Sequence, residues 1–154
     1  MGGNGSYSKI YRGVPDAKRT HIDTNMRIDG HKVLLYRKNV GQSKNVMNSS
    51  SKSPIYIIAN AKDGGSIVVH SVNIFKDHQI SLEINFKYDA NGNMIPYSKN
   101  SSKGSHAHQW YVNDSGEFHR KQHDINNVFN IPPEFHELVK HIVDFNKKRI
   151  KWTE

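Results

Sequence analysis

The stretch Gln79-Ile-Ser-Leu-Glu-Ile-Asn-Phe-Lys-Tyr88 decides the fold class of this chain. From Ile80 to Tyr88, apolar and polar side chains alternate strictly. Because successive side chains of a β-strand point to opposite faces, this alternation predicts a strand rather than a helix. One face of the strand is expected to be buried and the other to face water, which is typical of an antiparallel sheet.

Further strands are expected on both sides of this stretch. Turn sequences at residues 63–65 (Asp-Gly-Gly) and 113–116 (Asn-Asp-Ser-Gly) separate apolar runs, as hairpins require. The pattern predicts strands at residues 31–38, 55–61, 66–75, 79–88, 106–112 and 117–121, with 94–97 as a segment that pairs back.

A helix is expected near the C-terminal end. Pro132 and Pro133 suit a first helical turn, and apolar side chains then recur at helical spacing from Phe135 to Phe145. The chain is therefore predicted to be an α+β protein, with an antiparallel sheet of five or six strands covered by one C-terminal helix. Residues 31–154 are expected to form this single domain. Glycines interrupt residues 1–30, which are expected to be an irregular basic arm.

Composition excludes several classes of protein. A chain of 154 residues is about one domain in length. It has no cysteine, which excludes disulfides, thiolate metal sites and Cys nucleophiles and fits a cytoplasmic protein. No apolar run approaches the roughly 18 residues of a membrane span, so no membrane partner is expected.

The positive charge is concentrated in the first third of the chain. The whole chain has a net charge of +8, and residues 1–53, with ten Lys and Arg against three Asp, account for +7. Such an asymmetry favours a polyanionic partner such as RNA or a nucleotide. Lys18 and Arg19 are candidate phosphate contacts. A protein partner and the oligomeric state stay open.

A pair of histidines in Ser105-His106-Ala107-His108 is the main candidate site. Residues two apart in a strand share a face, so the two imidazoles are expected to project together. The partner strand brings further groups, which depend on the turn. A four-residue turn at 113–116 places Trp110, His108 and His106 opposite His119, Lys121 and His123, respectively. A three-residue turn shifts the register and places Arg120 on the face of the pair instead.

Two imidazoles beside a cation suit phosphodiester chemistry without a metal or another cofactor. One histidine takes a proton from the attacking hydroxyl, the other gives a proton to the leaving oxygen, and the cation stabilises the charge on the phosphoryl oxygens. RNA supplies its own nucleophile, the 2′-hydroxyl. The candidate catalytic residues are His106, His108, Lys121, Arg120 and His123. The candidate substrate contacts are Lys103, Ser105, Trp110, His119, His31, Arg19 and Lys18.

Three alternatives stay open at this point. The histidines can recognise a phosphate or base without turnover, as in a nucleotide- or nucleic-acid-binding protein. A His-x-His pair can also supply two metal ligands, with His123 or Asp124 as a third, as in a metal-dependent hydrolase. Finally, the pair can be polar residues on the water-facing side of a hairpin. The chain is therefore expected to be a metal-independent phosphodiesterase or ribonuclease, with a non-catalytic binding protein and a metal-dependent hydrolase as alternatives.

The stretch Lys103-Gly-Ser-His-Ala-His-Gln-Trp110 is similar to small phage or prophage proteins of Gram-positive bacteria. The order of elements over residues 31–145 resembles the small metal-independent ribonuclease toxins of the barnase/EndoU/colicin/RelE-like group. The resemblance implies an EndoU-like site of two histidines and a lysine, which His106, His108 and either Lys103 or Lys121 would supply. It also implies a toxin or counter-defence factor that cleaves or sequesters RNA or a signalling nucleotide.

Overall fold

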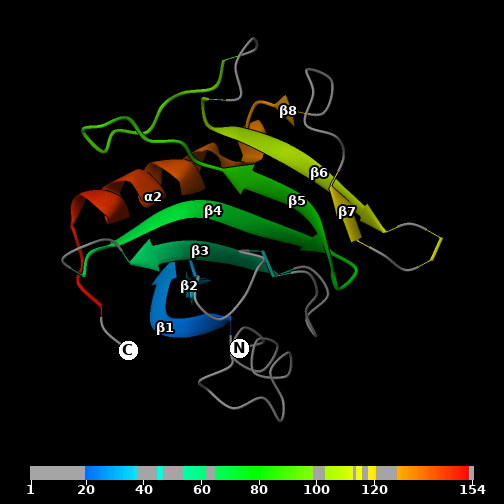
Figure 1. The fold of residues 1–154 in the computed structure, drawn as a ribbon, viewed down its shortest axis with the longest axis horizontal. Coiled ribbons are helices and arrows are strands. Elements are labelled where there is room, and N and C mark those ends of the chain that lie inside the picture. Colours follow the sequence, from blue (N-terminus) through cyan, green and yellow to red (C-terminus); the bar gives the residue numbers. More distant parts are fainter. Residues whose placement is uncertain are drawn as a thin grey trace.

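The computed structural model describes residues 20–37, 45–46, 54–61, 65–98, 103–112, 114–115, 118–120 and 128–152. A single twisted sheet dominates these residues, and one α-helix packs across it (Figure 1). Within the same residues, no helix is long and apolar enough to cross a membrane.

The sheet contains eight strands among the described residues, in the order β1-β2-β3-β4-β5-β6-β7, with β8 also paired to β6. The strands are β1 (His21–Ile28), β2 (His31–Tyr36), β3 (Ile55–Ala61), β4 (Ile67–Lys76), β5 (Gln79–Asn85), β6 (His106–Val112), β7 (Phe118–Arg120) and β8 (Val128–Phe129). A 3₁₀-helix, η2 (Pro133–Phe135), leads directly into α2 (His136–Lys147). The predicted α+β class and the C-terminal helix are confirmed.

Three features of the sheet differ from the expectation. The described residues form eight strands rather than five or six, because β1 and β8 were not expected. Strand β1 lies within residues 1–30, which were expected to be irregular, so that expectation is wrong for residues 21–28. Its period is hidden because the β1–β2 register shifts between Asp23 and Arg27, where Asn25 has a left-handed φ of 63°. The pairing of β2 with β3 is parallel, so the sheet is not purely antiparallel. Parallel neighbours need a long crossover, which residues 37–54 supply.

Residues 94–98 pair back onto the sheet near the end of β5. Tyr88 and Met94 form an isolated antiparallel bridge, and the amide of Ile95 donates to the carbonyl of Lys87 at 2.7 Å. The amide of Ser105 in turn donates to the carbonyl of Ile95 at 2.9 Å. The segment expected at 94–97 therefore does pair, and it lies between the end of β5 and the start of β6.

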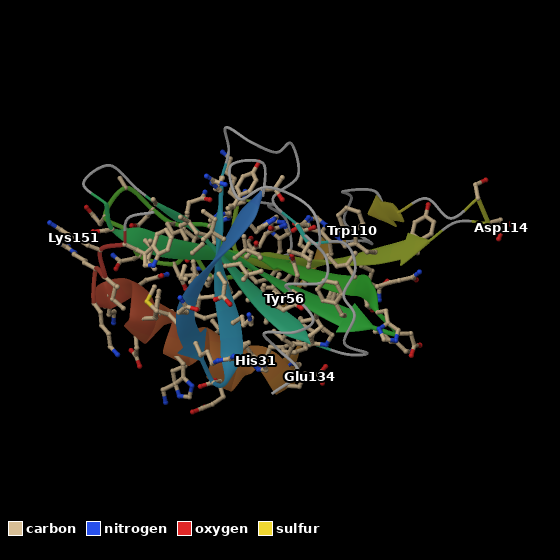
Figure 2. The ribbon with its side chains drawn as sticks, turned by 90° about the horizontal axis from the view of Figure 1, so that it is seen from below. His31, Tyr56, Trp110, Asp114, Glu134 and Lys151 are labelled. Carbon is tan, nitrogen blue, oxygen red and sulfur yellow. The ribbon has the colours of Figure 1, made fainter. Side chains whose placement is uncertain are left out.

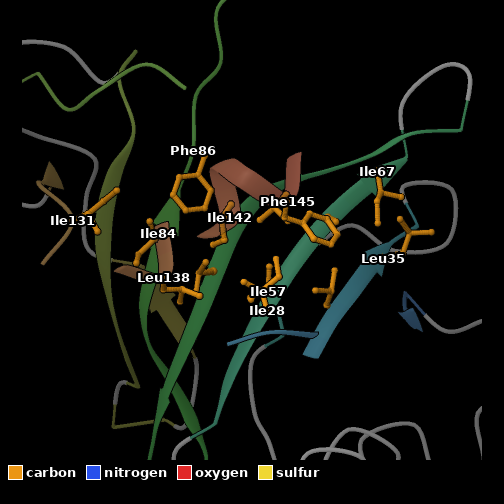
Figure 3. Close-up of a cluster of buried hydrophobic side chains, with 14 of the residues drawn as sticks. Ile28, Leu35, Ile57, Ile67, Ile84, Phe86, Ile131, Leu138, Ile142 and Phe145 are labelled. Carbon is orange, nitrogen blue, oxygen red and sulfur yellow. The ribbon is translucent and has the colours of Figure 1, made fainter. Parts of the chain in front are cut away.

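The apolar core lies between α2 and one face of the sheet, here called the helix face (Figure 3). Leu138, Ile142 and Phe145 recur along α2 at helical spacing and are all buried in this cluster. They pack against alternate residues of the central strands, which include Val33, Leu35, Ile57, Val69, Val72 and Ile84. This arrangement is the one that the period of residues 135–145 predicts.

The opposite side, here called the second face, is buried as well. It has its own apolar cluster, made of Leu34, Val46, Tyr56, Ile58, Phe75 and Ile80. Part of its cover is the segment at residues 45–46, where the Val46 amide donates to Asn73 Oδ1 at 2.9 Å and Asn73 Nδ2 donates to Asn45 Oδ1 at 2.9 Å. The expected water-facing side of β5 is therefore wrong, because Glu83 and Asn85 are buried there.

Candidate functional site

A group of buried polar side chains lies on the second face, across three neighbouring strands. We call it the polar patch, and it consists of Ser71, Asn73, Glu83, Asn85, His106 and His108. The strand register explains why these residues meet. Asn73 of β4 pairs with Glu83 of β5, which pairs with His108 of β6. Two residues away on each strand, Ser71 of β4 pairs with Asn85 of β5, which pairs with His106 of β6.

His106 and His108 are in direct contact within the polar patch. They lie two residues apart on β6 and therefore on one face of the sheet, as the strand period predicts. Their ring centroids are 4.6 Å apart and the ring planes are nearly perpendicular, at 88°. The two Nε2 atoms are 2.9 Å apart, which is a hydrogen-bond distance. Only 2% of His106 and 1% of His108 is exposed, so the pair does not lie on a water-facing hairpin surface.

A backbone carbonyl fixes one end of this pair. His106 Nδ1 lies 2.7 Å from the carbonyl oxygen of Gly104. A carbonyl oxygen only accepts hydrogen bonds, so Nδ1 of His106 carries a hydrogen and donates it. In the neutral pair, the hydrogen between the two Nε2 atoms belongs to His108, because His106 already carries its one ring hydrogen on Nδ1 and therefore accepts at Nε2. The histidines thus form one hydrogen-bonded unit rather than two separate acid and base groups.

A buried carboxyl group lies beside the pair on the neighbouring strand. Glu83 is fully buried and is the cross-strand partner of His108. Its Oε1 accepts a hydrogen bond of 2.8 Å from Trp110 Nε1. Cross-strand neighbours have Cβ atoms roughly 5 Å apart, so a charge on Glu83 acts directly on the imidazoles. A negative Glu83 stabilises a positive charge on the pair by Coulomb attraction in this buried setting.

No family profile, curated protein or solved structure matches this chain.

The geometry of the polar patch is therefore the basis for assigning a role. What it offers chemically is a proton held between two imidazoles, a carboxyl group beside them and an indole N–H that orients this carboxyl group. Groups of this kind transfer protons to and from a bound molecule.

The β6–β7 register settles which residues face each other at the hairpin. Trp110 pairs with Arg120 and Tyr111 pairs with His119. Val112 pairs with Phe118, which leaves the five residues 113–117 between the strands, so neither the four-residue nor the three-residue turn is formed. The observed register assigns the same faces as the three-residue turn. In that register the Arg120 position belongs to the face of Trp110 and the histidine pair, whereas the His119 position belongs to the helix face. The cause is that one residue of slip moves every side chain of a strand to the other face.

Four predicted site residues, Lys18, Arg19, Lys121 and His123, lie outside the described residues. Two others flank the pair on its N-terminal side. Lys103 is exposed, and Ser105 is buried with its Oγ accepting a hydrogen bond of 3.1 Å from the Lys87 amide. Ser105 therefore ties the start of β6 to the chain that follows β5.

His31 lies away from the polar patch. It alternates along β2 with Val33 and Leu35, which belong to the helix-face core, so it is on the opposite side of the sheet from the pair. Figure 2 shows His31 on the side where α2 lies and Trp110 on the other. Burial lowers the pKa of His31, with a smaller opposing effect from Asp29 and a further lowering by Arg27. The structure therefore does not bring His31 to the candidate site.

Sequence reasoning missed Glu83, Asn73 and the rest of the polar patch outside β6. The alternation of β5 marks its polar side chains, but polar side chains in a strand usually face water. Whether the polar side chains of β5 are buried or face water depends on whether another segment covers that face. Residues 45–46 cover part of it, but they are distant from β5 in the sequence. Glu83 has polar residues two positions before and after it in its strand. This pattern alone is only a weak indication of a buried polar site.

A metal would need a third ligand beside the two imidazoles. Among the described residues, no group of three or more His, Cys, Asp or Glu side chains is arranged to hold a metal ion. The third ligands considered from the sequence, His123 and Asp124, lie outside those residues.

Proposed function

We propose that this protein is a metal-independent phosphodiesterase or ribonuclease in which His106 and His108 transfer protons as one unit. The observation that carries the proposal is the 2.9 Å contact between the two Nε2 atoms, with His106 anchored on the Gly104 carbonyl. An imidazole ring has one nitrogen that accepts a proton and one that donates it, which suits general acid–base transfer.

The proposed reaction uses the nucleophile that RNA itself provides. The pair takes the proton of the 2′-hydroxyl, the 2′-oxygen bonds to phosphorus, and the bond from phosphorus to the 5′-oxygen breaks. The proton then passes to the 5′-oxygen, so the pair returns to its starting state. Negative charge grows on the phosphoryl oxygens during this step, and the cation expected from Arg120 or Lys121 would stabilise it. A signalling nucleotide with a phosphodiester is the other substrate of this class.

The burial of both imidazoles bears on how such a substrate reaches them. With 2% and 1% exposure, the pair requires the second face to open when the phosphodiester binds. Exclusion of water around a bound substrate then strengthens the electrostatic interactions that favour the reaction. The first third of the chain, with its net charge of +7, is the proposed source of attraction for the polyanion.

The test is a cleavage assay on RNA oligonucleotides and cyclic dinucleotides, in the presence of EDTA. His106→Ala and His108→Ala are each expected to lower turnover by roughly 10²–10⁴-fold. His78→Asn is the matched control, because His78 is exposed in the β4–β5 turn and asparagine tolerates its left-handed φ of 71°. Circular dichroism must show that the variants are folded. Absence of cleavage by the wild-type protein on every substrate would refute the proposal.

A binding protein without turnover is the second candidate, and the burial of the pair favours it. A catalytic proton donor must reach its substrate, whereas a buried hydrogen-bonded pair can simply stabilise a binding surface. This candidate includes a phage counter-defence factor that sequesters a nucleotide. It predicts binding of RNA or a nucleotide without cleavage. Activity that EDTA abolishes and a divalent ion restores would instead indicate a metal-dependent hydrolase.

A further inference from the structure

We propose that a cavity at the end of the β5–β6 ladder binds an uncharged planar ring, the base of a nucleotide. The cavity has a volume of about 580 Å³. This volume lies within the range of roughly 300–1,000 Å³ that is typical of small-molecule sites. A role of the cavity in turnover rests on the proposed function. The binding of a base does not, and it can be measured without any cleavage.

The cavity lies where β5 and β6 separate from each other. Their ladder ends at the pair of Leu82 and Gln109, and both residues line the cavity. On one side of this pair, β5 begins at Gln79 and is paired there with β4. On the other side, β6 continues to Val112 and is paired there with β7 (Figure 1). The separation of the two strands makes room for an occupant without any rearrangement of the sheet.

Aromatic rings line the cavity from both sides of the sheet. Tyr111 belongs to the helix face, because it alternates along β6 with Ala107 of the helix-face core, and Phe135 of η2 packs on that same core. Trp110 packs on the apolar cluster of the second face. Figure 2 shows Trp110 on the opposite side of the sheet from Glu134, the neighbour of Phe135. An occupant therefore meets aromatic rings on both sides, and bases stack well on aromatic side chains.

Tyr111 leaves much of its ring open to an occupant. It is 47% exposed and is the one large apolar side chain that is exposed among the described residues. The wall near it also contains Ile74 and Leu82, which are partly buried and pack on the helix-face core. A planar ring placed against Tyr111 therefore buries aromatic and aliphatic surface together, which favours binding.

The charges in the wall favour an uncharged ring over a phosphate. The wall contains one cation, Lys76, and one carboxylate, Glu134, and both are exposed. Their charges cancel, so the cavity has no net charge that would hold an anion. The positive charge of the chain lies instead mainly in residues 1–53. A nucleotide is therefore expected to place its base in the cavity and its phosphate outside it.

Trp110 connects the cavity with the polar patch. Its side chain lines the cavity, and its Nε1 donates the hydrogen bond of 2.8 Å to Glu83 Oε1. Glu83 is in turn the cross-strand partner of His108. A base bound in the cavity is thus separated from the histidine pair by Trp110 and Glu83. In the proposed phosphodiesterase, the cavity is the subsite that holds the base of the substrate next to the polar patch.

The direct test is ¹H–¹⁵N NMR of the folded full-length protein with adenosine, AMP and ribose 5-phosphate as probes. The chain has two tryptophans, and Trp152→Phe identifies which indole N–H signal belongs to Trp110. Adenosine and AMP should both shift the Trp110 signal, because both contain the base. Ribose 5-phosphate has the phosphate without a base and should leave this signal unchanged. The Trp152 signal is an internal control, because Figure 2 shows the adjacent Lys151 at the opposite end of the molecule from Trp110.

Substitutions of Tyr111 test whether the base binds in the cavity. Tyr111→Ala removes the exposed ring and should weaken the binding of adenosine by roughly tenfold or more, as the loss of a stacking side chain does. Tyr111→Phe is the matched control, because it keeps the ring and should keep the wild-type affinity. Phe135→Leu keeps an apolar side chain on the core but removes the second ring, and it should also weaken binding. Circular dichroism must show that each variant is folded.

The proposal is wrong if neither adenosine nor AMP shifts the Trp110 signal, or if ribose 5-phosphate shifts it as AMP does. It is also overturned if a folded Tyr111→Ala protein binds adenosine as tightly as the wild type. The result is separable from the proposed function. Cleavage of RNA without a base-dependent shift would remove the base site and leave the phosphodiesterase. A base-dependent shift in a protein that cleaves no substrate would support the base site and refute the phosphodiesterase.

Discussion

Glu83 carries a carboxyl group that is fully buried in the sheet. A carboxyl group without exposure is unfavourable unless its oxygens are hydrogen-bonded. Trp110 Nε1 donates one such bond to Oε1, and His108 is the cross-strand partner of Glu83. The same pairing means that Glu83 also satisfies the indole N–H, which is partly buried.

Two substitutions separate the hydrogen bond from the charge. Glu83→Gln keeps an oxygen acceptor for Trp110 but removes the negative charge, whereas Glu83→Leu removes both. Because a buried donor left without its acceptor costs about 1–3 kcal/mol, Glu83→Leu should lower the free energy of unfolding by about that amount more than Glu83→Gln. Urea unfolding followed by Trp fluorescence measures both. Equal stability of the two variants would show that the Trp110 contact contributes nothing.

At the scale of elements, α2 is joined to the turn between β1 and β2 by His141. Its Nδ1 lies 2.6 Å and 2.8 Å from the two carboxylate oxygens of Asp29, and its Nε2 lies 3.3 Å from Glu137. The hydrogen bond with Asp29 raises the pKa of His141 above its usual 6.5, desolvation opposes this effect, and the charges of Asp29, Glu137 and Asp144 raise the pKa further. Both imidazole nitrogens thus face carboxylates, which suits the protonated ring.

The raised pKa of His141 predicts a stability that depends on pH. The folded state binds the proton more tightly than the unfolded state, so the contribution is fully present below pH 6.5 and is lost as pH rises through the raised pKa. His141→Ala should therefore lower Tm relative to the wild type at pH 5.5 and have little effect at pH 9. Thermal unfolding at both pH values measures the difference. A decrease in Tm that is the same at both would contradict an ionic role for His141.

The sequence predicts an element well where the residues that determine it lie close together in the chain. The alternation of β5 and the helical period of α2 are local, and both elements form where they were expected. The same-face placement of His106 and His108 is also local. The contact between their Nε2 atoms is not, because it depends on Gly104 and on residues 94–98. The burial of Glu83 likewise depends on a cover from a distant part of the chain.

For the molecule as a whole, positive charge also gathers where α2 ends. Lys147, Lys148, Arg149 and Lys151 are all exposed there, although the last third of the sequence is nearly neutral. Backbone hydrogen bonds from Ile67 to Ile150 and from Trp152 to Gly65 anchor this segment to the sheet, so the cations stand on a fixed support. A fixed group of cations is suited to the phosphates of a single-stranded nucleic acid.

If the protein binds RNA as proposed, this group predicts part of the salt dependence of the binding. The affinity should fall with salt, and each phosphate contact to a single strand contributes about 0.7 to the slope of the logarithmic plot. Replacing Lys147, Lys148 and Arg149 by Gln should reduce the slope if they contact phosphates, whereas Lys76→Gln, on an exposed lysine at the end of β4, should not. Titrations by fluorescence anisotropy at several salt concentrations test this. Equal slopes for the triple variant and the wild type would place the binding surface elsewhere.

The way in which β6 is covered has a consequence for whether its backbone groups are open to another chain. Strand β7 pairs with residues 110–112 of β6, and β8 pairs with residues 107–108, so two short strands share the outer edge of one long strand. A long open edge is a template for intermolecular strand pairing and aggregation. Loss of the β8 pairing would expose the backbone groups of Ala107 and His108, so the segment that holds the histidine pair would also become the site at which copies of the chain adhere to one another.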